Sequence, residues 1–283
     1  MQPVKPIHLE PYVATTLGNA AERRTITAEQ VQSIVPERYP VYAIVATPKS
    51  GSTFLASVLA KSLDLPLIPL CYAYSSNEHD LYLPALVTAT ACGAVSQLHM
   101  KGTPHNVQLL NLFGIRPIVL TRNLFDSIES LARDFRKKCE MPGLGQGMSG
   151  YSFAWLTRDV ASLDEERMID FVIDFALPWY VNFYVSWQNL ARANAIAPIF
   201  LHYEDLMKDK GGEISRIVRE IGGTEVRLDT EVLGQDFISD ASTSNRGSGE
   251  SGLGLKCLSK AQVAAVRRLL SYYPDADFES WLA

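Results

Sequence analysis

Cysteine is scarce in this sequence of 283 residues, with four copies and no CxxC pair. Zinc sites built from cysteine use closely spaced pairs, and disulfide frameworks belong mainly to short, cysteine-dense secreted chains. A chain of this length also buries a large core without cross-links. We therefore expect neither a disulfide framework nor a cysteine zinc site, and interpret the four side chains as buried, reduced thiols: Cys71, Cys92, Cys139 and Cys257.

Long apolar runs are also lacking. The most apolar stretch, from Phe171 to Trp187, is interrupted by Asp174, Pro178 and Asn182. It is too short and too interrupted for a membrane-spanning helix, which needs ~20 mainly apolar residues. The first residues contain no apolar segment of the kind found in secretory signals. These absences predict a cytoplasmic protein without a membrane span.

A strong excess of one charge is absent as well. Lys and Arg total 26 and Asp and Glu total 31, for a formal net charge of −5. Such a balance argues against general nucleic-acid coating and against a basic membrane-surface role. A small anionic ligand stays compatible with it, because a few placed cations suffice. With 47% hydrophobic and 20% charged residues, the composition is that of a globular protein.

Short apolar segments alternate with helical patterns along the chain. This alternation predicts an α/β fold with a central parallel sheet covered by helices on both faces. We expect one domain over 1–283, with 1–40 as an N-terminal extension. Helices are expected to begin after the capping residues Thr27 and Ser259, and another to span about Asp209 to Ile221. The candidate strands are 41–46, 92–100, 116–121 and 197–203.

Aromatic residues recur at every fourth position within the apolar stretch. This spacing puts them close to one helix face, which is typical of a core-facing stripe. The alternative is that they form the wall of an acceptor pocket. The residues are Phe171, Phe175, Trp179, Phe183 and Trp187.

The densest chemistry lies in the turn between the first candidate strand and the next helix, Ala46 to Thr53. A turn that leads into a helix N-terminus presents unpaired N–H groups and the positive end of the helix dipole. Hydroxyl groups and Lys49 add donors that suit a phosphate or a sulfate. The Walker pattern is not met, because Lys49 precedes Gly51 by two residues and no glycine opens the loop. On spacing alone, an ordinary tight turn is equally compatible.

Two segments together carry a family resemblance. Residues Pro48 to Thr53 resemble the 5′-phosphosulfate-binding loop of sulfotransferases that use 3′-phosphoadenosine-5′-phosphosulfate (PAPS). Arg122, which ends a candidate strand, and Ser130, eight residues later, resemble that family's 3′-phosphate motif. The alternative interpretation of the second segment is a pair between Arg122 and Asp126 that caps the helix.

Further features follow in the family's order. Tyr203-Glu204-Asp205 is similar to a segment whose tyrosine contacts the nucleotide, and the Gly-rich 240–255 segment lies where relatives cover the 3′-phosphate. Two departures are that no lysine follows Arg246-Gly247 and that Phe54 stands where many relatives have tryptophan. The resemblance implies a three-layer, P-loop-like fold and these donor-binding residues: Lys49, Ser50, Gly51, Ser52, Thr53, Phe54, Arg122, Ser130, Tyr203, Arg246 and Gly247.

Sulfuryl transfer to an alcohol needs a base for the hydroxyl proton, and histidine suits that task. His99 follows a candidate strand and matches the family's catalytic position, whereas His105, six residues later, is the main rival. His202 lies within a candidate strand, which favours a core role. His8 and His79 lie in segments without a site signal. Lys49 is the second expected catalytic residue, because it would neutralise charge on the leaving phosphate.

The sequence therefore predicts a sulfotransferase that needs no metal and transfers a sulfuryl group from PAPS to a hydroxyl. The expected partner is a small-molecule or carrier-bound acceptor, whose pocket is expected from 71–90, 140–160 and 171–187. The aromatic content of these segments favours an apolar acceptor. A nucleotide kinase and a non-catalytic protein that binds a phosphoadenosine nucleotide are the alternatives. A homodimer and an origin within a larger synthase are left open.

Overall fold

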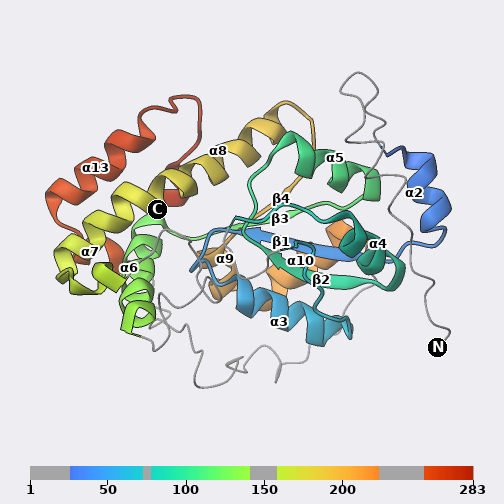
Figure 1. Cartoon of the computed structure of the whole chain (residues 1–283), viewed down its shortest axis with the longest axis horizontal. Coiled ribbons are helices and arrows are strands. Elements are labelled where there is room, and N and C mark those ends of the chain that lie inside the picture. Colours follow the sequence, from blue (N-terminus) through green and yellow to red (C-terminus); the bar gives the residue numbers. More distant parts are fainter. Residues whose placement is uncertain (1–25, 73–77, 141–157, 223–251, 283) are drawn as a thin grey trace.

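A parallel sheet forms the centre of the protein. The computed structural model describes residues 26–72, 78–140, 158–222 and 252–282. Its four strands lie in the order β2-β1-β3-β4, and every neighbouring pair is parallel, which confirms the predicted α/β class (Figure 1). The strands are β1 (Val41–Ala46), β2 (Ala94–Leu98), β3 (Ile118–Thr121) and β4 (Ile199–His202).

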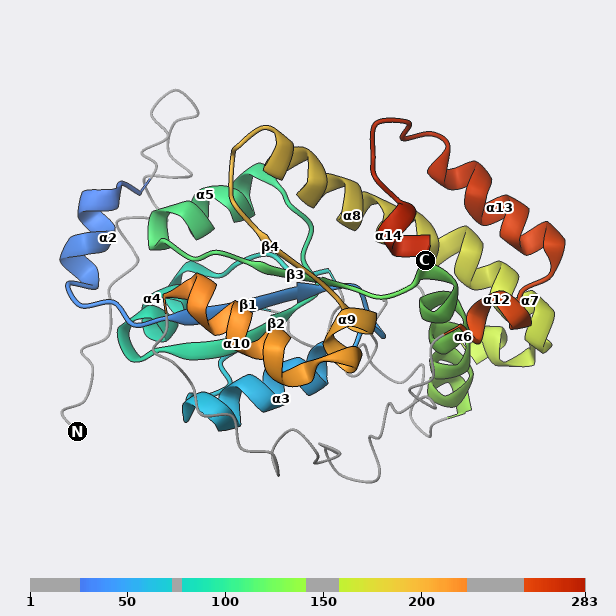
Figure 2. The ribbon, with the colours of Figure 1, turned by 180° about the vertical axis from the view of Figure 1, so that it is seen from behind.

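Alternate residues of β1 belong to two different apolar clusters. Tyr42 and Ile44 pack with α3 (Ser52–Leu63) and α10 (Lys210–Ile221), whereas Val41, Ala43 and Val45 pack with α4 (Leu83–Cys92) and α5 (Pro104–Phe113). Successive side chains of a strand point to opposite faces, so the sheet is covered on both. Figures 1 and 2 show the same layering, with α3 and α10 on one side of the sheet and α5 on the other.

Further helices lie beside the sheet, past the ends of its strands (Figure 1). Buried residues of α6 and α8 share one apolar cluster with β1, so this group packs continuously with the sheet layer. The group contains α6 (Leu124–Glu140), α7 (Glu165–Phe171), α8 (Leu177–Arg192), α12 (Gly254–Cys257), α13 (Lys260–Leu270) and α14 (Glu279–Leu282). The remaining helices are α2 (Ala28–Ile34), the 3-10 helix Arg158–Ser162 and α9 (Tyr203–Lys208).

Local capping chemistry starts several of these helices. Thr27 forms a capping box with Gln30 at α2, and Ser259 forms one with Gln262 at α13. Asp209 accepts a hydrogen bond from the Gly212 N–H at the start of α10. Each side chain supplies an acceptor to an N–H that lacks a partner within the helix. The helix starts predicted from these residues are therefore confirmed.

The aromatic stripe lies on a helix that is longer than the sequence predicted. α7, a π-helical turn (Val172–Ala176) and α8 form one helical segment of 28 residues, Glu165–Arg192, which is long and apolar enough to cross a membrane by length and composition. However, 67% of its most apolar window is buried inside the protein, as expected for a core helix. The prediction that this stretch is too short is wrong, because Pro178 sits in the first turn of α8 and does not end the helix.

The π-helical turn also changes which aromatic residues are buried. Trp179, Phe183 and Trp187 are core residues, whereas Phe175 is 58% exposed. A π-helical turn contains more residues than an α-helical turn and shifts the side chains that follow it around the axis. The predicted core stripe is therefore confirmed for Trp179, Phe183 and Trp187 and wrong for Phe175, while Phe171 is partly buried against the core.

The cysteines differ from the prediction in one respect. Cys71, Cys92 and Cys257 are free thiols, but only Cys71 is buried. Cys92 and Cys257 are the last residues of α4 and α12, where the helix end faces solvent. The side chain of Cys139 lies outside the described residues.

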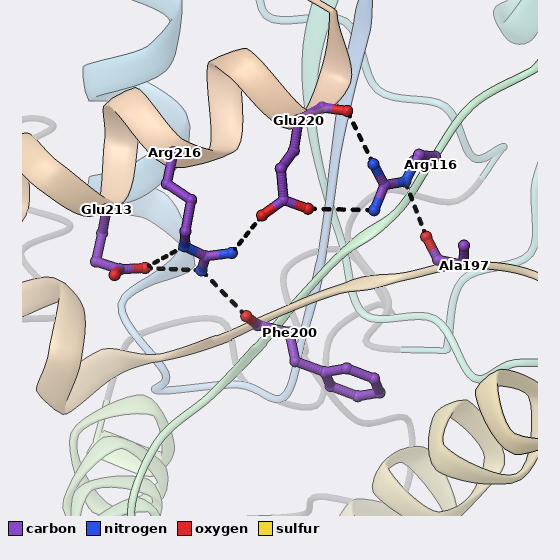
Figure 3. A network of polar contacts seen from close by, with 6 residues as sticks. All are labelled: Arg116, Ala197, Phe200, Glu213, Arg216 and Glu220. Atoms are coloured by element: carbon purple, nitrogen blue, oxygen red, sulfur yellow. Dashed lines mark hydrogen bonds and ion pairs between the residues drawn. The ribbon is translucent and has the colours of Figure 1, made fainter.

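A polar network ties α10 to the strands at the amino-terminal end of β3 (Figure 3). Arg116 donates hydrogen bonds to the carbonyls of Ala197 and Glu220, and its guanidinium lies 3.2 Å from the Glu220 carboxylate. Arg216 bridges Glu213 and Glu220 and donates to the Phe200 carbonyl. This network stabilises the edge of the sheet opposite the predicted site.

Candidate anion-binding and catalytic site

Predicted site residues follow every strand of the sheet. The loop 47–51 follows β1, His99 follows β2, Arg122 follows β3 and Tyr203 follows β4. Because all four strands are parallel, these residues share the carboxyl edge, in the spatial order His99, loop, Arg122, Tyr203. Ligands of open α/β sheets bind at this edge. The fold thus brings together segments that are far apart in the sequence.

The loop after β1 has an unusual backbone. Lys49 (φ 69°) and Gly51 (φ 82°) both adopt left-handed conformations, on either side of Ser50. Successive residues that alternate in this way turn their N–H groups into a concavity that suits an anion. The buried hydroxyls of Thr47 and Ser50 are 2.6 Å apart and brace the turn from inside. The loop therefore has an anion-binding shape although it lacks the Walker pattern.

Three groups hold the carbonyls of this loop and of Ala46, the residue before it. Tyr180 donates its hydroxyl to the Pro48 carbonyl at 2.8 Å, Arg122 donates Nη1 to the Lys49 carbonyl at 3.2 Å, and His99 Nδ1 lies 2.7 Å from the Ala46 carbonyl. Since the C=O and N–H of one trans peptide unit point in opposite directions, the next N–H in each case points away from these donors. Burial, and then the charge of Asp134, raise the pKa of Tyr180 well above its usual value, so its phenol stays protonated.

Gly51 allows the loop to lie against Tyr203. A Cβ atom built on Gly51 would lie 2.6 Å from two carbons of the Tyr203 ring. The Arg122 guanidinium lies 4.8 Å from the centre of the same ring, a cation–π distance. Glu204, the next residue in α9, accepts a hydrogen bond from the Asn123 N–H at 3.0 Å. The Tyr-Glu segment therefore links the β1 loop to the start of α6.

Arg122 and Ser130 are both buried, with exposed fractions of 9% and 4%. Arg122 precedes α6, and Ser130 lies on that helix. The Asp126 carboxylate accepts the Gly252 and Gly254 N–H groups at 2.7 Å each. In the described part of the chain, Asp126 thus anchors the backbone N–H groups of Gly252 and Gly254.

Lys49 points toward α6. Its ammonium lies 3.3 Å from an oxygen of Asp134, and both side chains are largely buried. Asp134 is four residues after Ser130, so the two lie on the same face of α6. Sequence reasoning missed Asp134. Its spacing from Ser130 was the available signal, but only the tertiary structure shows the contact with Lys49.

The imidazole of His99 has a defined protonation pattern. A carbonyl oxygen can only accept a hydrogen bond, so the 2.7 Å contact with Ala46 requires a proton on Nδ1. In the neutral ring, Nε2 then carries a lone pair. The geometry therefore presents the nitrogen form that a general base needs, at the carboxyl end of β2.

The other described histidines have different surroundings. His105 is exposed in the first turn of α5, and its Nε2 lies 3.3 Å from the Leu81 carbonyl. His202 lies 2.8 Å from the Thr121 hydroxyl. His79, for which the sequence contains no site signal, is buried and stacks on His99 with ring centres 5.6 Å apart.

The remaining predicted donor residues lie on or beyond α3. Ser52 is buried, and Thr53 donates a hydrogen bond to Gln97 at 3.3 Å. The Lys210 ammonium lies 5.3 Å from the centre of the Phe54 ring. Arg246 and Gly247 lie outside the described residues, as does most of the 240–255 segment. Among the described residues, no group of three or more His, Cys, Asp or Glu side chains could hold a metal ion.

The fold is shared with solved structures. Over 88% of this chain and 90% of the other, the structure is similar to mouse sulfotransferase SULT7A1 complexed with PAP, with a TM-score of 0.60 and 14% identity. It is also similar to retinol dehydratase in complex with androsterone and the inactive cofactor PAP, with a TM-score of 0.51 and 13% identity, over 88% of this chain and 85% of the other. No protein-family model and no curated protein matches the sequence. The chain thus has a fold found in PAP complexes.

Proposed function

We propose that the protein is a PAPS-dependent sulfotransferase that transfers a sulfuryl group to an acceptor hydroxyl. The observation that carries the proposal is the row of His99, the left-handed loop at Lys49, Arg122 and Tyr203 along one sheet edge. Two solved structures that share the fold contain PAP, which is the nucleotide that PAPS becomes when it loses its sulfuryl group. The sequence motifs, the position of these residues at the carboxyl edge of the sheet, and the fold all support PAPS as the sulfuryl donor.

In this proposal the two phosphate positions of the donor are held by residues that follow different strands. The N–H groups and hydroxyls of the loop and of the first turn of α3 hold the 5′-phosphosulfate. Arg122 and Ser130 hold the 3′-phosphate, and Tyr203 supports both because it contacts Gly51 and Arg122. Phe54 is proposed for the adenine, and Arg246 and Gly247 for the covering segment.

The reaction then needs one proton transfer and one bond exchange. His99 Nε2 accepts the hydroxyl proton while the acceptor oxygen forms a bond to sulfur. The bond between sulfur and the 5′-phosphate oxygen breaks, and the electron pair leaves with PAP. Lys49 neutralises the charge that develops on that oxygen. To do so, its ammonium must move from Asp134 to the phosphate.

The acceptor is proposed to be a hydroxyl-bearing, apolar small molecule, free or carrier-bound. Androsterone is present in the retinol dehydratase structure, which shares the fold. Exposed aromatic side chains on the segments expected to border the pocket support an apolar ligand: Tyr72 at 84%, Tyr82 at 40% and Phe175 at 58% exposure. A cytoplasmic location stays part of the proposal.

Nucleotide specificity tests the proposal directly. PAP should bind more tightly than adenosine 5′-monophosphate, because only PAP has a 3′-phosphate. At 100 times its dissociation constant, PAP should stabilise the fold by ~2.7 kcal/mol. Arg122→Ala should weaken PAP binding by ~1.5–3 kcal/mol, the range for hydrogen bonds to charged groups, and should remove most of the preference for PAP. Titration calorimetry measures both affinities.

The matched control is Arg116→Ala. Arg116 and Arg122 flank the same strand, but Arg116 belongs to the network at the opposite edge of the sheet (Figure 3). This variant should keep the wild-type preference for PAP. Equal affinity of the wild type for the two nucleotides, or an unchanged preference in Arg122→Ala, contradicts the proposed donor site.

A further inference from the structure

We propose that His79 is a positioning residue that fixes the orientation of the base His99; this inference rests on the proposed function. The two residues are 20 positions apart and come from different segments, the stretch before α4 and the end of β2. His79 is 5% exposed, so its imidazole belongs to the interior of the site and not to its surface.

Reciprocal hydrogen bonds join the two histidines. The backbone N–H of His99 donates to the ring nitrogen Nδ1 of His79 at 2.8 Å. The backbone N–H of His79 donates to the backbone carbonyl of His99 at 3.0 Å. The rings are stacked, with centres 5.6 Å apart and planes inclined by 30°. The backbone of His99 is therefore held by His79, while its ring is held by the Ala46 carbonyl at 2.7 Å. Because the backbone and the ring of His99 are both held, its Nε2 atom points in one direction.

The acceptor role of His79 also sets its charge. Nδ1 accepts the His99 N–H, so it carries a lone pair and the ring is the neutral Nε2–H form. A neutral neighbour does not repel the positive charge that His99 gains when it takes the hydroxyl proton. A protonated His79 would lose this hydrogen bond and would place a second cation beside His99. The arrangement thus favours proton transfer to His99 and not to His79.

The segment that carries His79 is itself fixed. The Leu81 N–H donates to Asn106 Oδ1 at 2.9 Å, and Asn106 Nδ2 donates to the Asp80 carboxylate at 3.0 Å. Asn106 is fully buried, and the Tyr82 N–H donates to the Leu70 carbonyl. His79 therefore lies in a hydrogen-bonded neighbourhood, which helps to support a residue that orients a reacting group.

Two substitutions separate the roles of the His79 ring. His79→Asn keeps an oxygen acceptor for the His99 N–H but loses the aromatic ring. His79→Phe keeps a ring that can stack but loses the acceptor. If the hydrogen bond orients the base, His79→Phe should lower kcat ~10–100-fold. This is the range found for the hydrogen-bond partners that orient metal-ligating histidines. His79→Asn should recover most of this loss. The PAP dissociation constant should change less than about twofold in both, because PAP is held elsewhere.

Turnover is measured as PAP release from PAPS, with 2-naphthol as a phenolic probe acceptor. A second readout needs no acceptor: long-range ¹H–¹⁵N spectra of the histidine rings report which nitrogen of His99 carries the proton. The wild type and His79→Asn should show a proton on Nδ1 only. His79→Phe should show a mixture of the two neutral forms, because a His99 residue released from His79 no longer keeps its ring against the Ala46 carbonyl. If His79→Phe does not fold, His79→Ala replaces it in the comparison.

Wild-type kcat and an unchanged His99 proton pattern in His79→Phe would overturn the inference. Equal losses in His79→Phe and His79→Asn would overturn it as well, because they would show that the acceptor does not matter. Failure of the proposed function is distinguishable: the wild type would then not prefer PAP, while the His99 spectra would still compare the His79 variants.

Discussion

The hydrogen-bonding states of single side chains decide what the candidate site can do. The contact with the Ala46 carbonyl requires a proton on Nδ1 of His99, so Nε2 of the neutral ring carries the lone pair that the proposed base needs. Tyr180 keeps its proton because burial raises its pKa, and it can therefore hold the Pro48 carbonyl at any neutral pH. In both cases the surroundings of the side chain select one of two possible protonation states.

Replacement of His99 by Ala should lower turnover ~10²–10⁴-fold, the usual contribution of a positioned proton acceptor. PAP affinity should persist, because in the proposed donor site the loop, Arg122 and Ser130 hold the nucleotide and His99 does not. His105→Ala is the control, since His105 is exposed and contacts the Leu81 carbonyl. His105→Ala should lower turnover only slightly. The acidic limb of the wild-type pH–rate profile should disappear in His99→Ala. Near-normal turnover in His99→Ala, together with collapse in His105→Ala, would assign the base to His105.

Asp134→Asn should raise PAP affinity by roughly tenfold, or ~1.4 kcal/mol. The wild-type carboxylate is 6% exposed, pairs with Lys49 at 3.3 Å and opposes an incoming phosphate in a poorly screened environment. The asparagine removes this charge and releases the Lys49 ammonium for the nucleotide. Titration calorimetry at two salt concentrations measures the gain. Weaker or unchanged binding would show that Asp134 helps to present Lys49.

At the scale of elements, the site depends on junctions where a strand passes into a helix. Asp126, in the first turn of α6, accepts the N–H groups of Gly252 and Gly254. A Cβ built on Gly254 would lie 2.1 Å from the backbone of Phe125, so the close approach of α12 to α6 leaves no room for a side chain at this position. This contact places the end of the Gly-rich segment beside the helix that begins after Arg122.

Gly51→Ala should disturb such a junction at the start of α3. The added Cβ meets the Tyr203 ring at 2.6 Å, and the backbone φ of 82° is itself unfavourable for alanine. Gly114→Ala is a matched control, because Gly114 has a φ of 66° but nothing within 4 Å of a Cβ. Gly114→Ala should cost the ~1–2 kcal/mol of left-handed strain. Gly51→Ala should cost more in urea unfolding and should also weaken PAP binding. Equal costs and unchanged PAP affinity would exclude the Tyr203 contact as a constraint.

At the scale of the whole molecule, the buried core contains acidic groups that are kept protonated. Burial raises the pKa of Tyr42, Tyr180 and Tyr184, and raises that of Cys71 to about 11. These groups come from β1, α8 and the segment before α4. Folding thus depends on the protonated form of several groups at once.

Stability should consequently fall at alkaline pH. A group whose pKa is raised by folding contributes fully below its unfolded pKa, roughly 8.5 for Cys and 10 for Tyr, and the contribution is lost as pH rises toward the folded pKa. The free energy of unfolding should therefore decrease from about pH 9 upward. Tyr180→Phe should reduce the slope above pH 10 by up to ~1.4 kcal/mol per pH unit. Urea unfolding between pH 7 and 11 measures this; an unchanged slope in Tyr180→Phe would contradict a buried, protonated phenol.

Local sequence patterns determined the four strands, several of the helices and the general place of the site. The apolar segments, the caps at Thr27 and Ser259, and the loop around Gly51 depend on neighbours within a few positions, so they can be predicted from the chain alone. Because ligands of parallel α/β sheets bind at the carboxyl edge, the position of His99 after a candidate strand also predicted where it would lie.

Only the tertiary structure decided which groups surround these residues. Lys49 meets Asp134 across 85 positions, Pro48 meets Tyr180 across 132, and His99 meets His79 across 20. No local pattern encodes such contacts, because they arise when strand order and helix packing bring distant segments to one edge. The exposed Phe175 is a further example: it lies in a π-helical turn, which interrupts a periodicity that the sequence shows as regular.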